Sequence, residues 1–233
     1  MKNWTANSVS NFLMGGDDMK IVWLGHSCFK ITLDNSKVMV FDPFDPSCGY
    51  ENFAIKADYV FISHDHRDHN CLEFITGDYT LLNKPDKFES KDIKVLGLNT
   101  FHDKIKGEKR GMNTVFKVSA GEINIVHLGD LGDIPSDDFY KKLGQVDILL
   151  IPVGGVYTID EKQALSVIDK TVPNIIIPMH YLTDVSKIDV NPITGFLETI
   201  KGLYDFSKLG KNEFSISKKD LKKRTRVVIM DYS

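Results

Sequence analysis

The chain has 233 residues, of which 42% are hydrophobic and 26% are charged, and its formal net charge at pH 7 is −3. This length and apolar content allow one globular domain with a full core, or two fused half-domains. The slightly acidic balance provides no large positive field, so polymeric nucleic acid is disfavoured as a partner.

Residues 1–18 differ from the rest of the chain, because they are rich in Asn, Ser, Gly and Asp and precede a second methionine, Met19. We expect an N-terminal extension over 1–18 and a single domain over 19–233. From Met19 onward, short apolar or alternating runs bounded by turn residues predict β-strands. These runs cover 20–24, 28–33, 37–42, 59–63, 79–82, 93–98, 114–119, 122–128, 147–153, 174–179 and 225–231.

Helical patterns are fewer than strand patterns. The clearest one begins after Asp160, a suitable N-cap, and runs to Thr171. Further helices are expected to begin near His69, Ser136 and Thr194. A helix beginning near His69 would direct its N-terminal amides toward an anionic group. Buried strands combined with outer helices predict layered sheets with helices outside.

The strongest motif is HDHRDH at 64–69, which directly follows an apolar run. Imidazole and carboxylate ligands suit zinc, iron or manganese, and the lack of cysteine in the motif argues against a purely structural zinc site. Side chains alternate along an extended segment, so His64 and His66 should face the same side, with Asp65 and Arg67 pointing away. The motif predicts a catalytic metal site.

All seven histidines lie at or near the end of an apolar, strand-like run. They are His26, His64, His66, His69, His102, His127 and His180. Functional side chains of open sheets gather at strand ends. A lone histidine at such a place is usually structural, but dispersed histidines that accompany a cluster favour one shared site.

The chain resembles the metallo-β-lactamase-fold hydrolase superfamily, and more closely its branch of ascorbate-6-phosphate lactonase-like enzymes and uncharacterised zinc-dependent hydrolases. The resemblance rests on LGHSC at 24–28, FDPF at 41–44, SHDHRDH at 63–69, FHD at 101–103, HLGDLG at 127–132, PVGGVYTID at 152–160 and PMHY at 178–181. It implies an α/β (α+β) fold, namely a four-layer αββα sandwich of two mixed β-sheets with helices on the outer faces. It also implies a binuclear metal site in a groove at one edge.

The same resemblance implies a set of seven metal ligands. The first ion would be held by His64, His66 and His102, and the second by Asp68, His69 and His180. Asp130 would bridge them, because the two oxygens of one carboxylate can hold ions spaced about 3.5–4 Å apart. Zinc is favoured as the divalent ion at both positions, although manganese and iron also suit these ligands.

Two metal ions around one water predict hydrolysis. Coordination lowers the pKa of the water to about 7, so that a metal-bound hydroxide can attack a small ester, lactone or phosphodiester. Asp68 would orient this nucleophile and shuttle its proton. Ser63 stands beside the motif without a GxSxG elbow, so we interpret it as structural rather than as a nucleophile.

Three further residues are candidates for supporting the ligands or the leaving group. Asp42 matches a family position that supports the ligand loop by hydrogen bonding, with a turn or capping role before the next proline as the alternative. His26 and His127 would assist the leaving group or line the pocket, unless they are simply buried and hydrogen-bonded. Neither is counted as a metal ligand.

Three others are candidates for contact with the substrate. Arg110 belongs to the basic loop 104–111, which would receive a phosphate or carboxylate unless it is a solvated turn. Tyr157 and Tyr181 are expected near the mouth of the site, where either could instead only pack. The expected partner is therefore a small-molecule substrate, and the basic loop is compatible with an anionic one. The sequence is also compatible with a homo-oligomer.

The cysteines and the apolar segments bear on the compartment. The three cysteines form no CxxC pair, so neither a disulfide framework nor a thiolate zinc site is indicated. No apolar run approaches the roughly 18 residues needed to span a bilayer, and 1–18 lacks a secretory pattern. We expect a cytoplasmic protein without a membrane partner.

Two other functions compete with hydrolysis. Di-iron redox proteins of the same fold typically carry Glu where His66 stands, together with a flavin domain for which this chain is too short. A metal-binding regulatory protein without turnover would show a lost ligand, and all seven implied ligands are present. Both alternatives are disfavoured.

Overall fold

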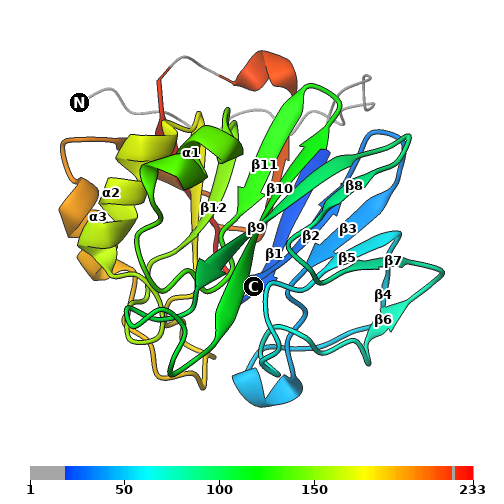
Figure 1. Cartoon of the computed structure of the whole chain (residues 1–233), viewed down its shortest axis with the longest axis horizontal. Coiled ribbons are helices and arrows are strands. Elements are labelled where there is room, and N and C mark those ends of the chain that lie inside the picture. The colour runs from blue at the N-terminus through cyan, green and yellow to red at the C-terminus, as the bar shows by residue number, and fades with distance from the viewer. Residues whose placement is uncertain (1–18, 222–223, 233) are drawn as a thin grey trace.

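Two β-sheets packed face to face form the centre of the molecule (Figure 1). The computed structural model describes residues 19–221 and 224–232, so the expected extension over 1–18 lies outside the described residues. One sheet has the strand order β15-β1-β2-β3-β5-β7, the other β14-β16-β13-β12-β11-β10-β9-β8, and a short ladder pairs β4 with β6. The predicted sandwich of two mixed sheets is confirmed.

The strands have the following bounds: β1 Met19–Gly25, β2 Cys28–Thr32, β3 Val38–Phe41, β4 Ile55–Lys56, β5 Tyr59–Phe61, β6 Ile75–Thr76, β7 Thr80–Leu82, β8 Lys87–Glu89, β9 Lys94–Phe101, β10 Met112–Ala120, β11 Ile123–His127, β12 Ile148–Pro152, β13 Ile175–Met179, β14 Asp205–Lys208, β15 Glu213–Ile216 and β16 Arg226–Ile229. The helices are α1 Asp137–Leu143, α2 Glu161–Thr171 and α3 Thr194–Ile200, with 3-10 turns η1 Pro46–Cys48 and η2 Lys218–Asp220. The sequence did not predict β4, β6, β8, β14 or β15, which are short and mostly lie at sheet edges.

The first sheet has apolar side chains on both faces. In β1, Ile21 and Trp23 face the core between the sheets, whereas Leu24 belongs to a second apolar cluster on the outer face. Between the sheets, Phe61 of β5 packs edge-on against Phe116 of β10, with ring centroids 5.4 Å apart. Alternation along each strand therefore supplies two apolar layers.

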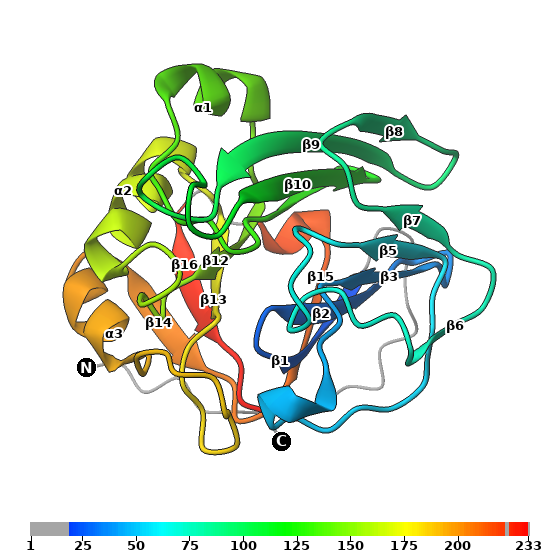
Figure 2. The same ribbon diagram turned by 60° about the horizontal axis from the view of Figure 1, so that its bottom comes forward.

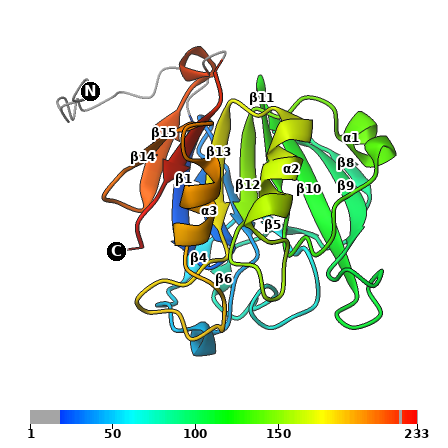
Figure 3. The ribbon, with the colours of Figure 1, turned by 90° about the vertical axis from the view of Figure 1, so that its left-hand side faces the viewer.

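The three α-helices cover the outer face of the second sheet (Figures 2 and 3). The central strands β12 and β13 are buried along their whole length, as expected for parallel strands enclosed on both faces. The helices begin where the sequence predicted, and Asp160 caps α2 by accepting a hydrogen bond from the Gln163 N–H. None of the helices in the described part of the chain is long and apolar enough to cross a membrane.

The outer face of the first sheet is covered by residues 43–79, which contain η1 and the β4–β6 ladder. The prediction of a helix beginning near His69 is wrong, because residues 67–69 form a turn closed by the His69 N–H on the His66 carbonyl. The chain is then drawn across the sheet, since the Cys71 N–H bonds the Pro43 carbonyl and Ile75 pairs with β4. No helix dipole acts at this turn.

Topology brings two sets of strand ends to one edge of the sandwich. In the first sheet, β1 and β3 are both antiparallel to β2, and β5 is parallel to β3. The strands β1, β3 and β5 therefore run in the same direction. In the second sheet, β9 and β11 are both antiparallel to β10, and β11, β12 and β13 are parallel. The residues that follow four of these strands, β5, β9, β11 and β13, contain every predicted metal ligand.

Candidate metal centre

The HDHRDH motif follows β5 and contributes the first group of ligand atoms. His64 and His66 lie with His102, which follows β9, and their candidate ligand atoms all lie within 4.8 Å of one another. Asp65 and Arg67 point away as predicted, since Asp65 accepts a hydrogen bond from the Asn70 side chain and Arg67 donates to Ser47 Oγ. The geometry thus assembles the three residues expected at the first ion.

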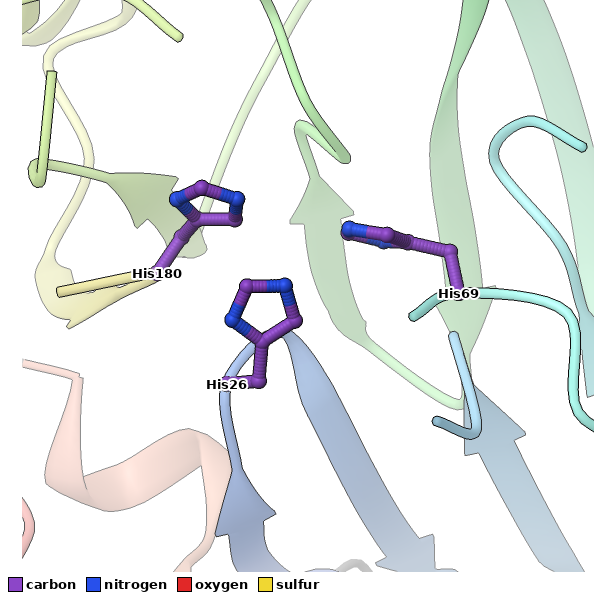
Figure 4. Close-up of side chains that lie close together, drawn as sticks. All are labelled: His26, His69 and His180. Atoms are coloured by element: carbon purple, nitrogen blue, oxygen red, sulfur yellow. The ribbon is translucent and has the colours of Figure 1, made fainter. Parts of the chain in front are cut away.

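A second group contains His26, His69 and His180. These rings come from the β1–β2 turn, the turn after β5 and the end of β13, and they point toward one another (Figure 4). Their candidate ligand atoms also lie within 4.8 Å of one another. His26, which sequence reasoning did not count as a ligand, therefore stands inside this group.

Asp130 lies between the two groups. Its Oδ1 is 3.3 Å from His69 Nε2, and its Oδ2 is 3.1 Å from His180 Nε2 and 3.4 Å from His102 Nε2. The carboxylate is only 2% exposed. Asp130 therefore lies within 3.4 Å of histidines from both groups.

Asp68 approaches the second group from the solvent side. Its Oδ2 lies 3.4 Å from His26 Nε2 and 3.7 Å from His69 Nε2, and about a quarter of its side chain is exposed. Burial opposes ionisation of this carboxyl group, but the neighbouring rings of His26 and His69 hold its pKa below the ordinary value. Asp68 is therefore an anion at neutral pH.

Asp42 fixes two of the histidines from behind. Its carboxylate accepts hydrogen bonds from the Ser63 N–H (2.8 Å), from Ser63 Oγ (2.6 Å) and from His69 Nδ1 (2.9 Å). Because the Ser63 hydroxyl donates to Asp42, it accepts from His64 Nδ1 at 2.9 Å. Both rings thus carry a proton on Nδ1, which leaves Nε2 as the atom available to a metal ion, the arrangement required of a metal-binding imidazole.

The charges at the site favour a cation. Burial lowers the pKa of His64 to about 2, so this ring is neutral. Burial also disfavours charge on His69, but the carboxylates of Asp130 and Asp42 outweigh it and raise the pKa of that ring well above its ordinary value. His180 and His69 hold the pKa of Asp130 well below the ordinary range despite its burial. A proton is attracted where the carboxylates meet, as a metal ion would be.

Several buried polar atoms at the centre have no hydrogen-bond partner among the described residues. They include both ring nitrogens of His26 and of His180, Nε2 of His64 and His69, Nδ1 of His102 and Oδ1 of Asp130. Each unsatisfied buried group costs about 1–3 kcal/mol, so such a collection is unfavourable unless a ligand satisfies it. Imidazole nitrogens and a carboxylate oxygen fit divalent zinc, manganese or iron.

The backbone is strained at three of these positions. His26, Asp42 and His180 have positive φ angles of 50°, 43° and 54°, which cost roughly 1–3 kcal/mol each for residues other than glycine. The His180 N–H bonds the His26 carbonyl across the two sheets at 3.1 Å, which locks both turns. A Cβ on Gly132 would collide with the His102 backbone, so glycine is required beside Asp130.

Arg110 and Tyr157 line the same cavity as the cluster, as predicted for residues that contact substrate. The cavity has a volume of about 210 Å³ and is lined by His66, Asp68, His102, Arg110, Asp130 and Tyr157. The guanidinium carbon of Arg110 lies 4.9 Å from the centre of the Tyr157 ring. Both side chains are half-buried.

Two of the predicted residues, His127 and Tyr181, are engaged away from the metal-ligand cluster. His127 is buried with both nitrogens engaged, since Nε2 bonds the Ser27 carbonyl and Nδ1 accepts from the Gly129 N–H. Its ring stacks on Phe41, so the structure agrees with the alternative given for this residue, a buried and hydrogen-bonded histidine. Tyr181 packs on Trp23 and donates to the Met230 carbonyl, which agrees with the alternative that this tyrosine only packs.

Sequence reasoning missed Asn113 and underrated Ser63. The side chain of Asn113 is buried in β10, accepts from the Asp130 N–H at 2.9 Å and donates to the Leu128 carbonyl, thereby holding the loop that carries Asp130. A polar residue at a buried strand position was the available signal. Ser63 is structural, as expected, but it also orients His64.

Replacement of Asp42 by Asn should weaken metal binding while preserving the turn, because Asn tolerates a positive φ angle. The amide offers fewer acceptor sites to Ser63 and His69, and a donor facing His69 Nδ1 would favour the ring with its proton on Nε2. We expect metal affinity to fall by roughly 10- to 100-fold in a zinc competition titration. Asp45→Asn, in an exposed turn on the same loop, is the matched control and should bind zinc like the wild type. Equal affinity of both variants would remove the positioning role of Asp42.

The chain is similar to known proteins both in sequence and in fold. Residues 20–180 match the model of the Beta-lactamase superfamily domain. The chain is 31% identical over 185 residues to a UPF0173 protein of Pyrococcus abyssi, covering 71% of this chain and 84% of that protein. It is 30% identical over 194 residues to a UPF0173 metal-dependent hydrolase of Carboxydothermus hydrogenoformans, covering 71% and 85%.

A solved structure from Thermotoga maritima shows the same fold. That protein, described as a Zn-dependent hydrolase of the metallo-β-lactamase superfamily, superposes with a TM-score of 0.73 at 34% sequence identity. The match covers 91% of this chain and 98% of the other.

Proposed function

This chain belongs to the β-lactamase superfamily and within it to the UPF0173 proteins, and we propose that it is a metal-dependent hydrolase with two divalent ions at its active centre. Relatives from several organisms carry the name metal-dependent hydrolase, which supports the reaction type. The observation that carries the proposal is the convergence of buried, unpartnered ligand atoms on Asp130.

The candidate ligand atoms form overlapping groups, since His64 and His69 also lie with Asp130, and they would divide between two ions. His64, His66 and His102 would hold the first ion, and Asp68, His69 and His180 the second, with Asp130 shared between them. His26 would complete or flank the second ion, because its Nε2 faces Asp68 and its ring lies 4.3 Å from the His180 ring. Zinc is the favoured metal on the grounds of the ligand set.

Bound divalent ions lower the pKa of a coordinated water to about 7 and polarise a carbonyl or phosphoryl oxygen. Asp68 is ionised and reaches the cavity, so it can orient a water molecule and accept its proton. His26 supports this role, since burial lowers its pKa to about 4 and keeps the ring neutral beside the carboxylate. No serine nucleophile is needed, because Ser63 Oγ is committed to Asp42.

The substrate that we propose is a small ester, lactone or phosphodiester. The cavity of about 210 Å³ opens at the cluster and suits a small molecule better than a polymer. The net charge of −3 likewise favours no polyanion.

The purified protein should contain close to two equivalents of metal per chain by elemental analysis. Hydrolysis of bis(p-nitrophenyl) phosphate or p-nitrophenyl acetate should be lost on chelation and restored by zinc, manganese or iron. A screen of metabolite lactones and cyclic phosphates would then identify the natural bond. Metal-free protein, or hydrolysis that survives complete removal of metal, would contradict the proposal.

A further inference from the structure

The loop that follows His102 is held in one conformation by a single buried carboxylate. Asp103 is 6% exposed and accepts four backbone hydrogen bonds. Its Oδ1 accepts from the N–H groups of Ile105 and Gly107, and its Oδ2 accepts from those of Lys109 and Arg110, at distances of 2.8–3.0 Å. The backbone of Arg110 is therefore fixed relative to the metal centre, rather than free as in a solvated turn.

The side chain of Arg110 is oriented by Tyr157. The guanidinium lies over the tyrosine ring at 4.9 Å, in cation–π geometry, and Tyr157 comes from the loop that follows β12. Two separate loops thus define the position of this charge.

No carboxylate among the described residues neutralises the positive charge of Arg110. Within the described part of the chain, its guanidinium forms no salt bridge, whereas Lys104 of the same loop lies 3.4 Å from Asp160. The two carboxylates that share the cavity with Arg110 are Asp68 and Asp130, and both are assigned to the metal centre. An ordered guanidinium beside such a centre is suited to bidentate binding of a carboxylate or phosphate.

We propose that Arg110, held over Tyr157, binds an anionic carboxylate or phosphate group of the substrate and thereby selects negatively charged substrates. This inference rests on the proposed hydrolase function, because it assigns a specificity residue to that site. Arg110 contacts the substrate but takes no part in bond cleavage. Tyr157 acts through Arg110 and is a positioning residue.

Binding of simple anions tests the inference without catalysis. Inorganic phosphate and acetate are titrated separately by calorimetry into the metal-loaded wild type, Arg110→Gln, Arg110→Lys and Lys109→Gln. Loss of a charge-assisted, bidentate contact should weaken binding of the preferred anion roughly tenfold in Arg110→Gln. Arg110→Lys should give a smaller loss, because it keeps the charge without the planar fork. Lys109→Gln removes an exposed charge outside the cavity and should bind like the wild type.

Kinetics with one charged and one neutral substrate separate selection from general damage. In Arg110→Gln, the KM for bis(p-nitrophenyl) phosphate should rise roughly tenfold, with little change in kcat or in the KM for neutral p-nitrophenyl acetate. Tyr157→Leu should shift the same KM in the same direction, and Tyr157→Phe should behave like the wild type because it retains the ring.

The outcomes distinguish this inference from the proposed function. If neither anion binds to the wild type, or if Arg110→Gln binds both as tightly as the wild type, the inference is wrong. Equal increases of KM for the charged and the neutral substrate would also overturn it, since they would indicate a structural role. Anion binding that depends on Arg110 in a protein that hydrolyses neither ester would contradict the hydrolase proposal and leave the anion site standing.

Discussion

Replacement of Asp68 by Asn should abolish most hydrolysis while leaving the protein folded. The side chain is partly exposed and ionised, and it reaches both the cavity and the rings of His26 and His69. Asn has nearly the same shape but cannot take a proton from water, and as a neutral ligand it binds a cation less well. We expect kcat to fall by about 100- to 10,000-fold, the range typical of a lost general base.

The experiment for Asp68 requires a folding control and a charge control. Circular dichroism and the melting temperature of Asp68→Asn should match those of the wild type, because the carboxylate of Asp68 is not part of the buried hydrogen-bond network of Asp42. Asp65→Asn is the matched control, since Asp65 lies in the same motif but is exposed and bonded to Asn70. Retained hydrolysis in Asp68→Asn would refute the proposed mechanism.

Replacement of Asp130 by Ala should disassemble the metal centre. The carboxylate lies within 3.4 Å of His69, His102 and His180, and therefore touches both groups of ligand atoms. Its removal should release at least one metal ion per chain, measured by elemental analysis after dialysis. Hydrolysis should fall by about a thousandfold or more, since metal stabilisation of the transition state is worth several kcal/mol.

The controls for Asp130 separate metal loss from unfolding. Asp133→Ala changes a half-buried carboxylate of the same loop that bonds only its local backbone in the turn, so its metal content should equal that of the wild type. Asp130→Asn keeps the side-chain shape and provides a second test if the alanine variant is unstable. Unchanged metal stoichiometry in both folded Asp130 variants would exclude a bridging role.

Sequence patterns correctly predicted those elements that are stabilised by residues close to one another in the sequence. The helix α2 begins after Asp160 because an aspartate there caps the first turn, and the structure shows both hydrogen bonds of a capping box with Gln163. The same logic failed near His69, where long-range hydrogen bonds to Pro43 and pairing of Ile75 with β4 hold the chain in a turn. The edge strand β14 also escaped prediction, because its pairing with β16 bridges an intervening strand and turn. The edge strand β8 pairs with the adjacent β9, but its three residues are too few to show a strand pattern.

In the candidate site, too, the sequence predicted the local features and tertiary packing decided the long-range ones. By itself, the sequence determined the chemistry of HDHRDH, because three imidazoles and a carboxylate within one turn can serve a metal wherever the turn lies. Only the tertiary structure decided which distant residues join that turn, because this depends on the strands that end at one edge of the two sheets. It brought His26 into the cluster, and it left His127 outside because nearby backbone groups occupy both of its nitrogens. Hydrogen-bond occupancy and strand direction are properties of the packed molecule, so no spacing along the chain could have revealed them.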